Sequence, residues 1–105
     1  MVSELELWAI STGATTCCID VELYEACRIA GVVERLVVDP QTDCLEATVT
    51  DGTARVTARW SLATGAIRGL ACGTRILLEG VAVAGPDAQP ILDEPALQIA
   101  DGEFA

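Results

Sequence analysis

The sequence predicts a small all-β protein of five strands. Short segments in which apolar and polar residues alternate are separated by turn-forming Gly, Pro and Asp residues, which is typical of strands. Hydrophobic residues make up 51% of the 105 residues and aromatic residues only 4%, so the core must consist of Val, Leu, Ile and Ala. A chain of this length forms one domain that buries about two-thirds of its unfolded surface.

The N-terminal residues allow two interpretations. Ser3 with Glu6 fits a capping box, which predicts a short helix in an N-terminal extension over residues 1–18. Leucines between acids in residues 4–7 fit a strand equally well. Residues 19–24 alternate apolar and polar side chains, so we expect a lead-in strand at the start of a domain over residues 19–100.

The first long strand is predicted at CRIAGVVERLVV, Cys27 to Val38, because this segment is rich in β-branched residues. Gly31 lies in its interior, where glycine usually marks a bulge or a sharp bend. We therefore expect a bent strand. The following DPQTD, residues 39–43, has the Pro and Asp content of a turn.

Residues 45–50 and 53–60 form a predicted hairpin. Both segments alternate strictly, and Asp51-Gly52 between them is a typical two-residue type I′ turn. Such a turn pairs Thr50 with Thr53.

The hairpin separates an apolar face from a polar one, because successive side chains of a strand point to opposite sides. Thr48, Arg55, Thr57 and Arg59 share the polar face, with Glu46 placed diagonally between the two arginines by the expected register. Trp60 shares its parity with the apolar residues, so we expect it to point into the core.

Glycine spacing divides the rest of the chain. SLATGAIRGLACGT, residues 61–74, is a loop or carries a short helical turn over 66–71. RILLEGVAVA, Arg75 to Ala84, predicts the fourth strand, and ILDEPALQIA, Ile91 to Ala100, predicts the fifth. Pro95 implies that the fifth strand lies at an edge or is broken.

The acidity of the chain belongs to its two ends. The formal net charge is -10, yet residues 27–84 contain equal numbers of acids and arginines. Residues 1–26 and 85–105, which include an acidic tail at 101–105, contain acids and no arginine. The middle of the protein is therefore neutral, and the net charge does not exclude an anionic ligand there.

The cysteines and the termini suggest a reduced, cytoplasmic protein. Five cysteines at irregular spacing argue against a disulfide framework, and the absence of His and of a CxxC pair argues against a metal site. No apolar run reaches the roughly 20 residues of a membrane span, and the start is acidic where a secretory peptide is basic. We expect no membrane association.

The order strand, strand, strand, short helical turn, strand, strand is the pattern of the OB-fold, a five-stranded Greek-key barrel. RIAGVVERLVVDP, LEATVTDGTARVTARW and IRGLACGTRILLEGVAV resemble the small OB-fold nucleic-acid-binding proteins of high-GC bacteria. The resemblance covers residues 19–99 and implies binding of single-stranded DNA or RNA by the outer face of strands two and three.

Carried over by position, the resemblance implies that a defined set of residues contacts the ligand. Thr48, Arg55, Thr57 and Arg59 form its centre beside Glu46, the loops 39–43 and 85–90 flank it, and Arg35, Arg68 and Arg75 lie at its rim. The arginines would hold phosphates or stack on bases. No catalytic residue and no cofactor is expected, because a nucleophile would lack its histidine base and no phosphate-binding loop is present.

Two alternatives stay open. Arg55 and Arg59 could simply pair with Glu46 on a solvated face. The acidic exterior could instead bind a basic protein partner, or an open sheet edge could form a homo-oligomer. In this family the segment after the third strand is usually rich in arginine, and the loop between the fourth and fifth strands is commonly basic. This chain reads SLATGAIRG and AGPDAQP there, so much of the expected phosphate contact is missing.

Overall fold

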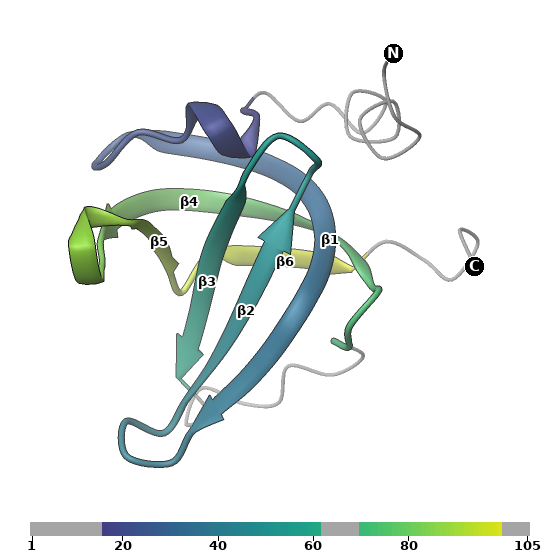
Figure 1. Cartoon of the computed structure of the whole chain (residues 1–105), viewed down its shortest axis with the longest axis vertical. Coiled ribbons are helices and arrows are strands. Elements are labelled where there is room, and N and C mark those ends of the chain that lie inside the picture. The colour runs from purple at the N-terminus through teal and green to yellow at the C-terminus, as the bar shows by residue number, and fades with distance from the viewer. Residues whose placement is uncertain (1–15, 62–69, 100–105) are drawn as a thin grey trace.

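Strands dominate the protein. The structure, a computed structural model, describes residues 16–61 and 70–99. Its elements are η1 (Cys18–Asp20), β1 (Ala26–Asp39), β2 (Cys44–Thr50), β3 (Arg55–Ser61), β4 (Arg75–Ala84), η3 (Pro86–Ala88), β5 (Pro90–Asp93) and β6 (Ala96–Ile99) (Figure 1). The predicted all-β class is confirmed.

Five of the strands close into a ring. Each of the pairs β1–β2, β2–β3, β4–β5 and β1–β4 is antiparallel, and β3 pairs with β5 in parallel. β6 also pairs with β4, at residues 76–79, whereas β5 pairs with β4 at residues 82–84. β1 can reach both β2 and β4 because it is long and curves around the ring (Figure 1).

The strand boundaries agree with the sequence pattern in the middle of the chain and differ at its start. β4 spans the predicted residues, and the predicted fifth strand is broken around Pro95 into β5 and β6. The predicted lead-in strand at residues 19–24 is wrong: η1 continues to Asp20, and within this segment only Leu23 forms a bridge, to Ala82. The possible N-terminal helix, the acidic tail and most of the possible helical turn at 66–71 lie outside the described residues.

Gly31 allows β1 and β2 to approach closely. A Cβ atom at this position would lie 2.7 Å from the carbonyl oxygen of Thr50. The irregularity in the β1–β2 register falls slightly later, between Val33 and Arg35. The bend is confirmed, but the bulge is three residues beyond the glycine that predicted it.

The hairpin register differs from the prediction by two residues. Thr50 pairs with Arg55, so the loop contains residues 51–54 rather than Asp51-Gly52 alone. The Thr50 hydroxyl donates to the carbonyl oxygen of Ala54 at 2.7 Å, across this wider loop. Because the shift is an even number of residues, every side chain keeps its predicted face.

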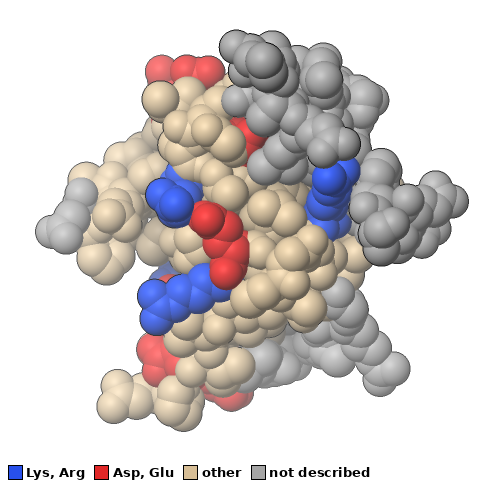
Figure 2. All heavy atoms as spheres, turned by 45° about the vertical axis from the view of Figure 1, so that its right-hand side comes forward, with Lys and Arg blue, Asp and Glu red and all other residues tan. Residues whose placement is uncertain are grey.

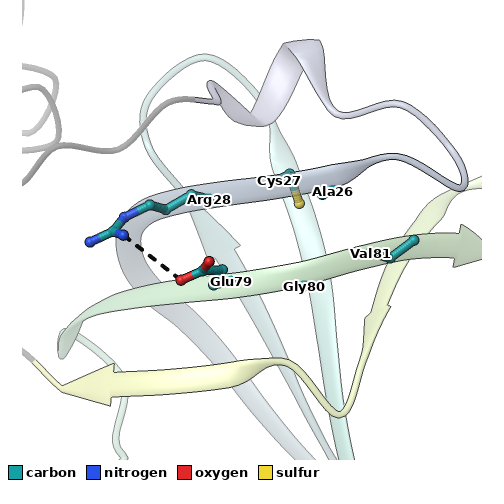
Figure 3. A pocket seen from close by; sticks show the side chains of 6 residues that line it. All are labelled: Ala26, Cys27, Arg28, Glu79, Gly80 and Val81. Atoms are coloured by element: carbon teal, nitrogen blue, oxygen red, sulfur yellow. Dashed lines mark ion pairs between the residues drawn. The ribbon is translucent and has the colours of Figure 1, made fainter.

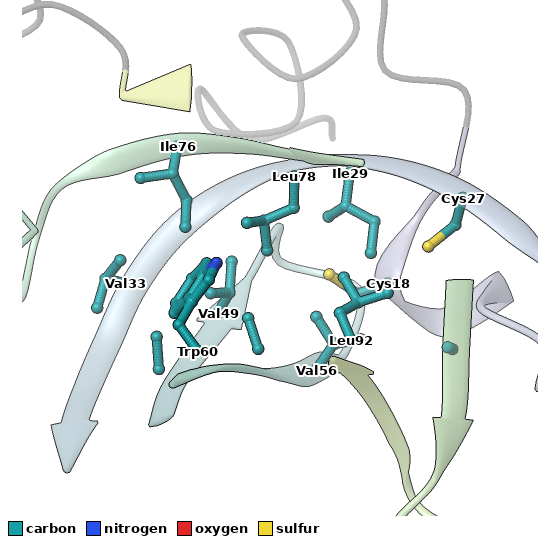
Figure 4. Packing of buried hydrophobic residues seen from close by; sticks show 13 residues of the cluster. Cys18, Cys27, Ile29, Val33, Val49, Val56, Trp60, Ile76, Leu78 and Leu92 are labelled. Atoms are coloured by element: carbon teal, nitrogen blue, oxygen red, sulfur yellow. The ribbon is translucent and has the colours of Figure 1, made fainter. Parts of the chain in front are cut away.

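A single apolar core fills the ring (Figure 4). Trp60 is only 3% exposed, and its indole N–H donates to the carbonyl oxygen of Pro95 at 3.0 Å. The prediction that Trp60 points inward is confirmed. The largest fully buried side chains around it are Ile29, Val33, Val49, Ile76, Leu78 and Leu92.

Candidate nucleic-acid interface

The outer face of β2 and β3 brings together arginines from two strands. The register places Arg35 of β1 beside Thr48 of β2, and Thr48 beside Thr57 of β3. Arg55 and Arg59 lie two residues before and after Thr57, hence on the same side of the sheet. The three guanidinium groups therefore extend from strand positions around a central pair of threonines.

Both β3 arginines point outward but have carboxylate neighbours. The Arg55 side chain is 70% exposed, and its Nε donates to Oε1 of Glu34 at 2.7 Å. The Arg59 side chain is 38% exposed, and its Nε lies 3.5 Å from Oδ1 of Asp93. The sequence left open that both arginines pair with Glu46 instead of a ligand. That alternative named the wrong partner, because the carboxylates beside them are Glu34 and Asp93.

The carboxylate partners come from strands that flank the hairpin. The register irregularity after Val33 leaves two consecutive residues, Glu34 and Arg35, exposed on β1. Glu34 thereby reaches Arg55, whereas Asp93 of β5 lies directly beside Arg59 in the register. Glu46 is opposite Arg59 on β2.

The surface carries mixed charge rather than a basic patch. Figure 2 shows blue and red side chains lying next to each other, with no large blue area on this side of the molecule. Within residues 16–61 and 70–99, acids outnumber arginines by more than two to one. An anionic ligand on this face must therefore compete with carboxylates for Arg55 and Arg59.

The two loops expected to flank the ligand carry no cation. In the turn after β1, Oδ1 of Asp39 accepts a hydrogen bond from the Gln41 N–H at 2.9 Å. That bond, with hydrogen bonds from Thr42, lowers the pKa of Asp39, so this carboxylate stays charged. The loop after β4 forms η3 and leads into β5, in which Ile91 is buried.

The three predicted rim arginines have different positions. Arg35 is exposed at the edge of the threonine pair, as expected. Arg75 begins β4 and pairs with Val32 of β1, so β1 separates it from the hairpin. Arg68 lies outside the described residues.

Asp51, which the sequence marked only as a turn residue, is a buried structural acid. It is 4% exposed, and its carboxylate accepts hydrogen bonds from the backbone N–H groups of Cys18 and Thr53, each at 2.9 Å. Burial alone would raise its pKa, but these bonds and one from the Thr53 hydroxyl outweigh burial and lower it. The spacing Asp-x-Thr is the signal of an Asx turn that predicts such a role.

The five cysteines range from buried to exposed, with Cys44 intermediate. Cys18 and Cys27 pack in the core, where burial, with the nearby Asp51 charge, raises the pKa of the Cys18 thiol to about 12. Cys17 and Cys72 are exposed. In the described part of the chain, no three His, Cys, Asp or Glu residues lie together as metal ligands, and no helix is long and apolar enough to cross a membrane.

Comparison with known proteins identifies a fold and no family. No protein-family model matches the chain, and no curated protein does either. Among solved structures, OBody AM3L09 bound to hen egg-white lysozyme has a TM-score of 0.68 at 14% identity, over 84% of this chain and 95% of that one. OBody AM3L15, also bound to lysozyme, has a TM-score of 0.67 at 16% identity, over 88% and 93%. At such identities the likeness shows a shared β fold alone.

Proposed function

We propose that the ring is an OB-fold barrel and that the protein is a non-catalytic module binding single-stranded nucleic acid. The circular pairing of β1, β2, β3, β5 and β4 supports the fold assignment, together with the likeness to the OBodies. Free thiols at Cys18 and Cys27 suit the reducing cytoplasm, where we expect it to act.

One observation carries the proposal: Arg35, Arg55 and Arg59 surround the Thr48–Thr57 pair on the outer face of the ring. Guanidinium groups donate paired hydrogen bonds to phosphate oxygens, and threonine hydroxyls add neutral donors.

The proposed ligand contact is with phosphates rather than with bases. Aromatic side chains supply most base stacking in single-strand grooves, but Trp60 is buried and none of the described residues on this face is aromatic. We therefore expect little sequence preference.

The carboxylate neighbours weaken binding without preventing it. An ion pair between exposed side chains is worth at most about 1 kcal/mol, so a phosphate can replace Glu34 at Arg55 at small cost. Three phosphate contacts predict a salt slope of about -2 for log K against log salt, since each contact to a single strand contributes about -0.7. Affinity should then fall roughly 20-fold between 50 and 200 mM salt.

Fluorescence anisotropy with labelled oligo-dT and oligo-U tests the proposal. Replacing Arg55 and Arg59 together by Ala should reduce the salt slope to about -0.7. Arg28→Ala is the control for Arg55→Ala or Arg59→Ala alone. It removes the same charge, but from the β1–β4 side of the ring. Absence of binding at 50 mM salt, or equal weakening by Arg28→Ala, would contradict the proposal.

Protein contact is a second candidate function. The excess of acids over the described surface favours a cationic partner, and both β3 arginines are already near carboxylates. The OBodies, bound to lysozyme, illustrate a fold of this type engaging a protein. Self-association through a sheet edge is the remaining form of this candidate, and sedimentation analysis over a range of concentrations measures it.

A further inference from the structure

Tyr24 is an exposed aromatic residue in an unfavourable backbone conformation. The residue is 71% exposed, and its φ is 67°, in the left-handed region that Gly and Asn adopt at less cost. The Tyr24 N–H donates to the carbonyl oxygen of Ala82 at 2.6 Å, which holds the turn against β4. A ring this exposed gains little from packing, so the described residues offer little that offsets the cost of tyrosine at this φ.

A hollow of about 450 Å³ lies beside this turn, over the paired ends of β1 and β4 (Figure 3). Ala26 pairs with Val81 in the register, and Val81 is 47% exposed. Ala26 and Val81 line one end of the hollow, and the backbone of Tyr24 is hydrogen-bonded to Ala82, the residue after Val81. We call these three apolar residues, Tyr24, Ala26 and Val81, the Tyr24 surface. At the other end of the hollow, a terminal guanidinium nitrogen of Arg28 lies 3.8 Å from Oε2 of Glu79.

Carboxylates border the Tyr24 surface. Glu22 and Glu25 are exposed on either side of Tyr24 in the chain, and Glu79 is exposed on β4. Arg28 is the ion-pair partner of Glu79, whereas neither Glu22 nor Glu25 has such a partner among the described residues. Three carboxylates against Arg28 make the net charge of the described residues around the Tyr24 surface negative.

We propose that the Tyr24 surface docks a segment of another protein in which Lys or Arg residues flank an aliphatic side chain. The inference rests on protein contact, the second function above, and not on nucleic-acid binding. Val81 and the Tyr24 ring receive the aliphatic group, and Glu22 and Glu25 pair with the cations.

Charge decides between this occupant and the others. A nucleic acid would bring phosphates against the border carboxylates. A second copy of the chain, meeting the same surface across a two-fold axis, would oppose each set of carboxylates to itself. The site is also separate from the candidate nucleic-acid face, because β4 is adjacent to neither β2 nor β3 in the ring.

The test is an NMR titration of the ¹⁵N-labelled full chain with a synthetic octapeptide of alternating Lys and Leu. The amide signals of Tyr24, Ala26 and Val81 should shift. Tyr24→Asn should weaken peptide binding about tenfold, as removal of an aromatic anchor does, while the fold is kept because Asn accepts positive φ.

A matched pair of charge variants checks the electrostatic part. Glu25→Gln should weaken binding a few-fold and reduce its salt dependence. Asp43→Asn removes the same charge from the turn after β1, where φ is 55° and Asn is tolerated, and should leave binding unchanged.

Each other result overturns the inference in a recognisable way. Shifts confined to other strands would keep protein contact but reject this surface, and no shifts at all would reject both. Equal binding of an octapeptide with Glu in place of Lys would reject the cationic partner. Shifts of the same amides on concentrating the protein alone would show that the occupant is a second copy.

Discussion

Replacing Asp51 by alanine removes the acceptor that joins η1 to the β2–β3 loop. Asp51 is the buried partner of the Cys18 N–H, and it also accepts from the N–H and the hydroxyl of Thr53. In the variant the Cys18 N–H remains buried with no acceptor, whereas the Thr53 donors can turn to water. The two hydrogen-bond partners lie 33 residues apart, so the loss loosens η1 against the ring, although the Ile19 N–H still donates to the Thr53 hydroxyl oxygen at 3.1 Å.

The expected destabilisation is about 3 kcal/mol. A hydrogen bond to a charged acceptor contributes about 1.5 to 3 kcal/mol, and an unsatisfied buried donor adds a penalty of similar size. For a domain of this size, that change lowers Tm by roughly 10 to 20 °C. Urea unfolding followed by far-UV circular dichroism, with a reductant present, measures it as a lower midpoint at unchanged slope.

Asp51→Asn and a pH series separate charge from shape. Because folding lowers the pKa of Asp51 below its ordinary 3.8, its carboxylate stabilises the folded state above that pH. The stabilisation is lost as the pH falls below 3.8, so the wild type and Asp51→Asn should converge there. Two results would refute the role given to Asp51. One is a decrease in the free energy of unfolding of less than about 1 kcal/mol for Asp51→Ala. The other is a difference in that free energy between the wild type and Asp51→Asn that does not depend on pH.

Two further predictions concern packing and thiol exposure. Gly31→Ala should cost about 1 to 3 kcal/mol, because the new Cβ would lie 2.7 Å from the Thr50 carbonyl oxygen. Gly80→Ala, whose Cβ would lie 3.4 Å from Pro95, is the strand control, and equal effects in urea unfolding would count against the close approach. Iodoacetamide at pH 8 should label the exposed Cys72 of the folded protein, while Cys18, buried and with a pKa of about 12, reacts only after denaturation. Equal labelling rates by mass spectrometry would contradict the buried position of Cys18.

Local pattern predicted the strands and their faces, because both depend on neighbouring residues. The alternation around Trp60 fixed which side chains enter the core, and the structure confirms it. The hairpin register was not predictable in the same way. Asp51-Gly52 suits a two-residue turn locally, but Asp51 bonds to the backbone of Cys18, a residue from a distant part of the chain.

In the candidate interface, too, some features follow from neighbouring residues and others depend on distant parts of the chain. The outward direction of Arg55 and Arg59 follows from strand parity alone. Their ion-pair partners, Glu34 and Asp93, depend on a bulge in β1 and on the parallel pairing of β3 with β5. Neither feature has a clear local signal, so the sequence led to Glu46 instead. The exposure of Tyr24 likewise depends on how its turn is held against β4.

The most direct test of the proposed function is an NMR titration of the labelled protein with oligo-dT at 50 mM salt. We expect the amide signals of Thr48, Arg55, Thr57 and Arg59 to shift together, while those of Tyr24 and Val81 do not. Shifts centred on Tyr24 and Val81, or no shifts at all, would contradict the proposed function.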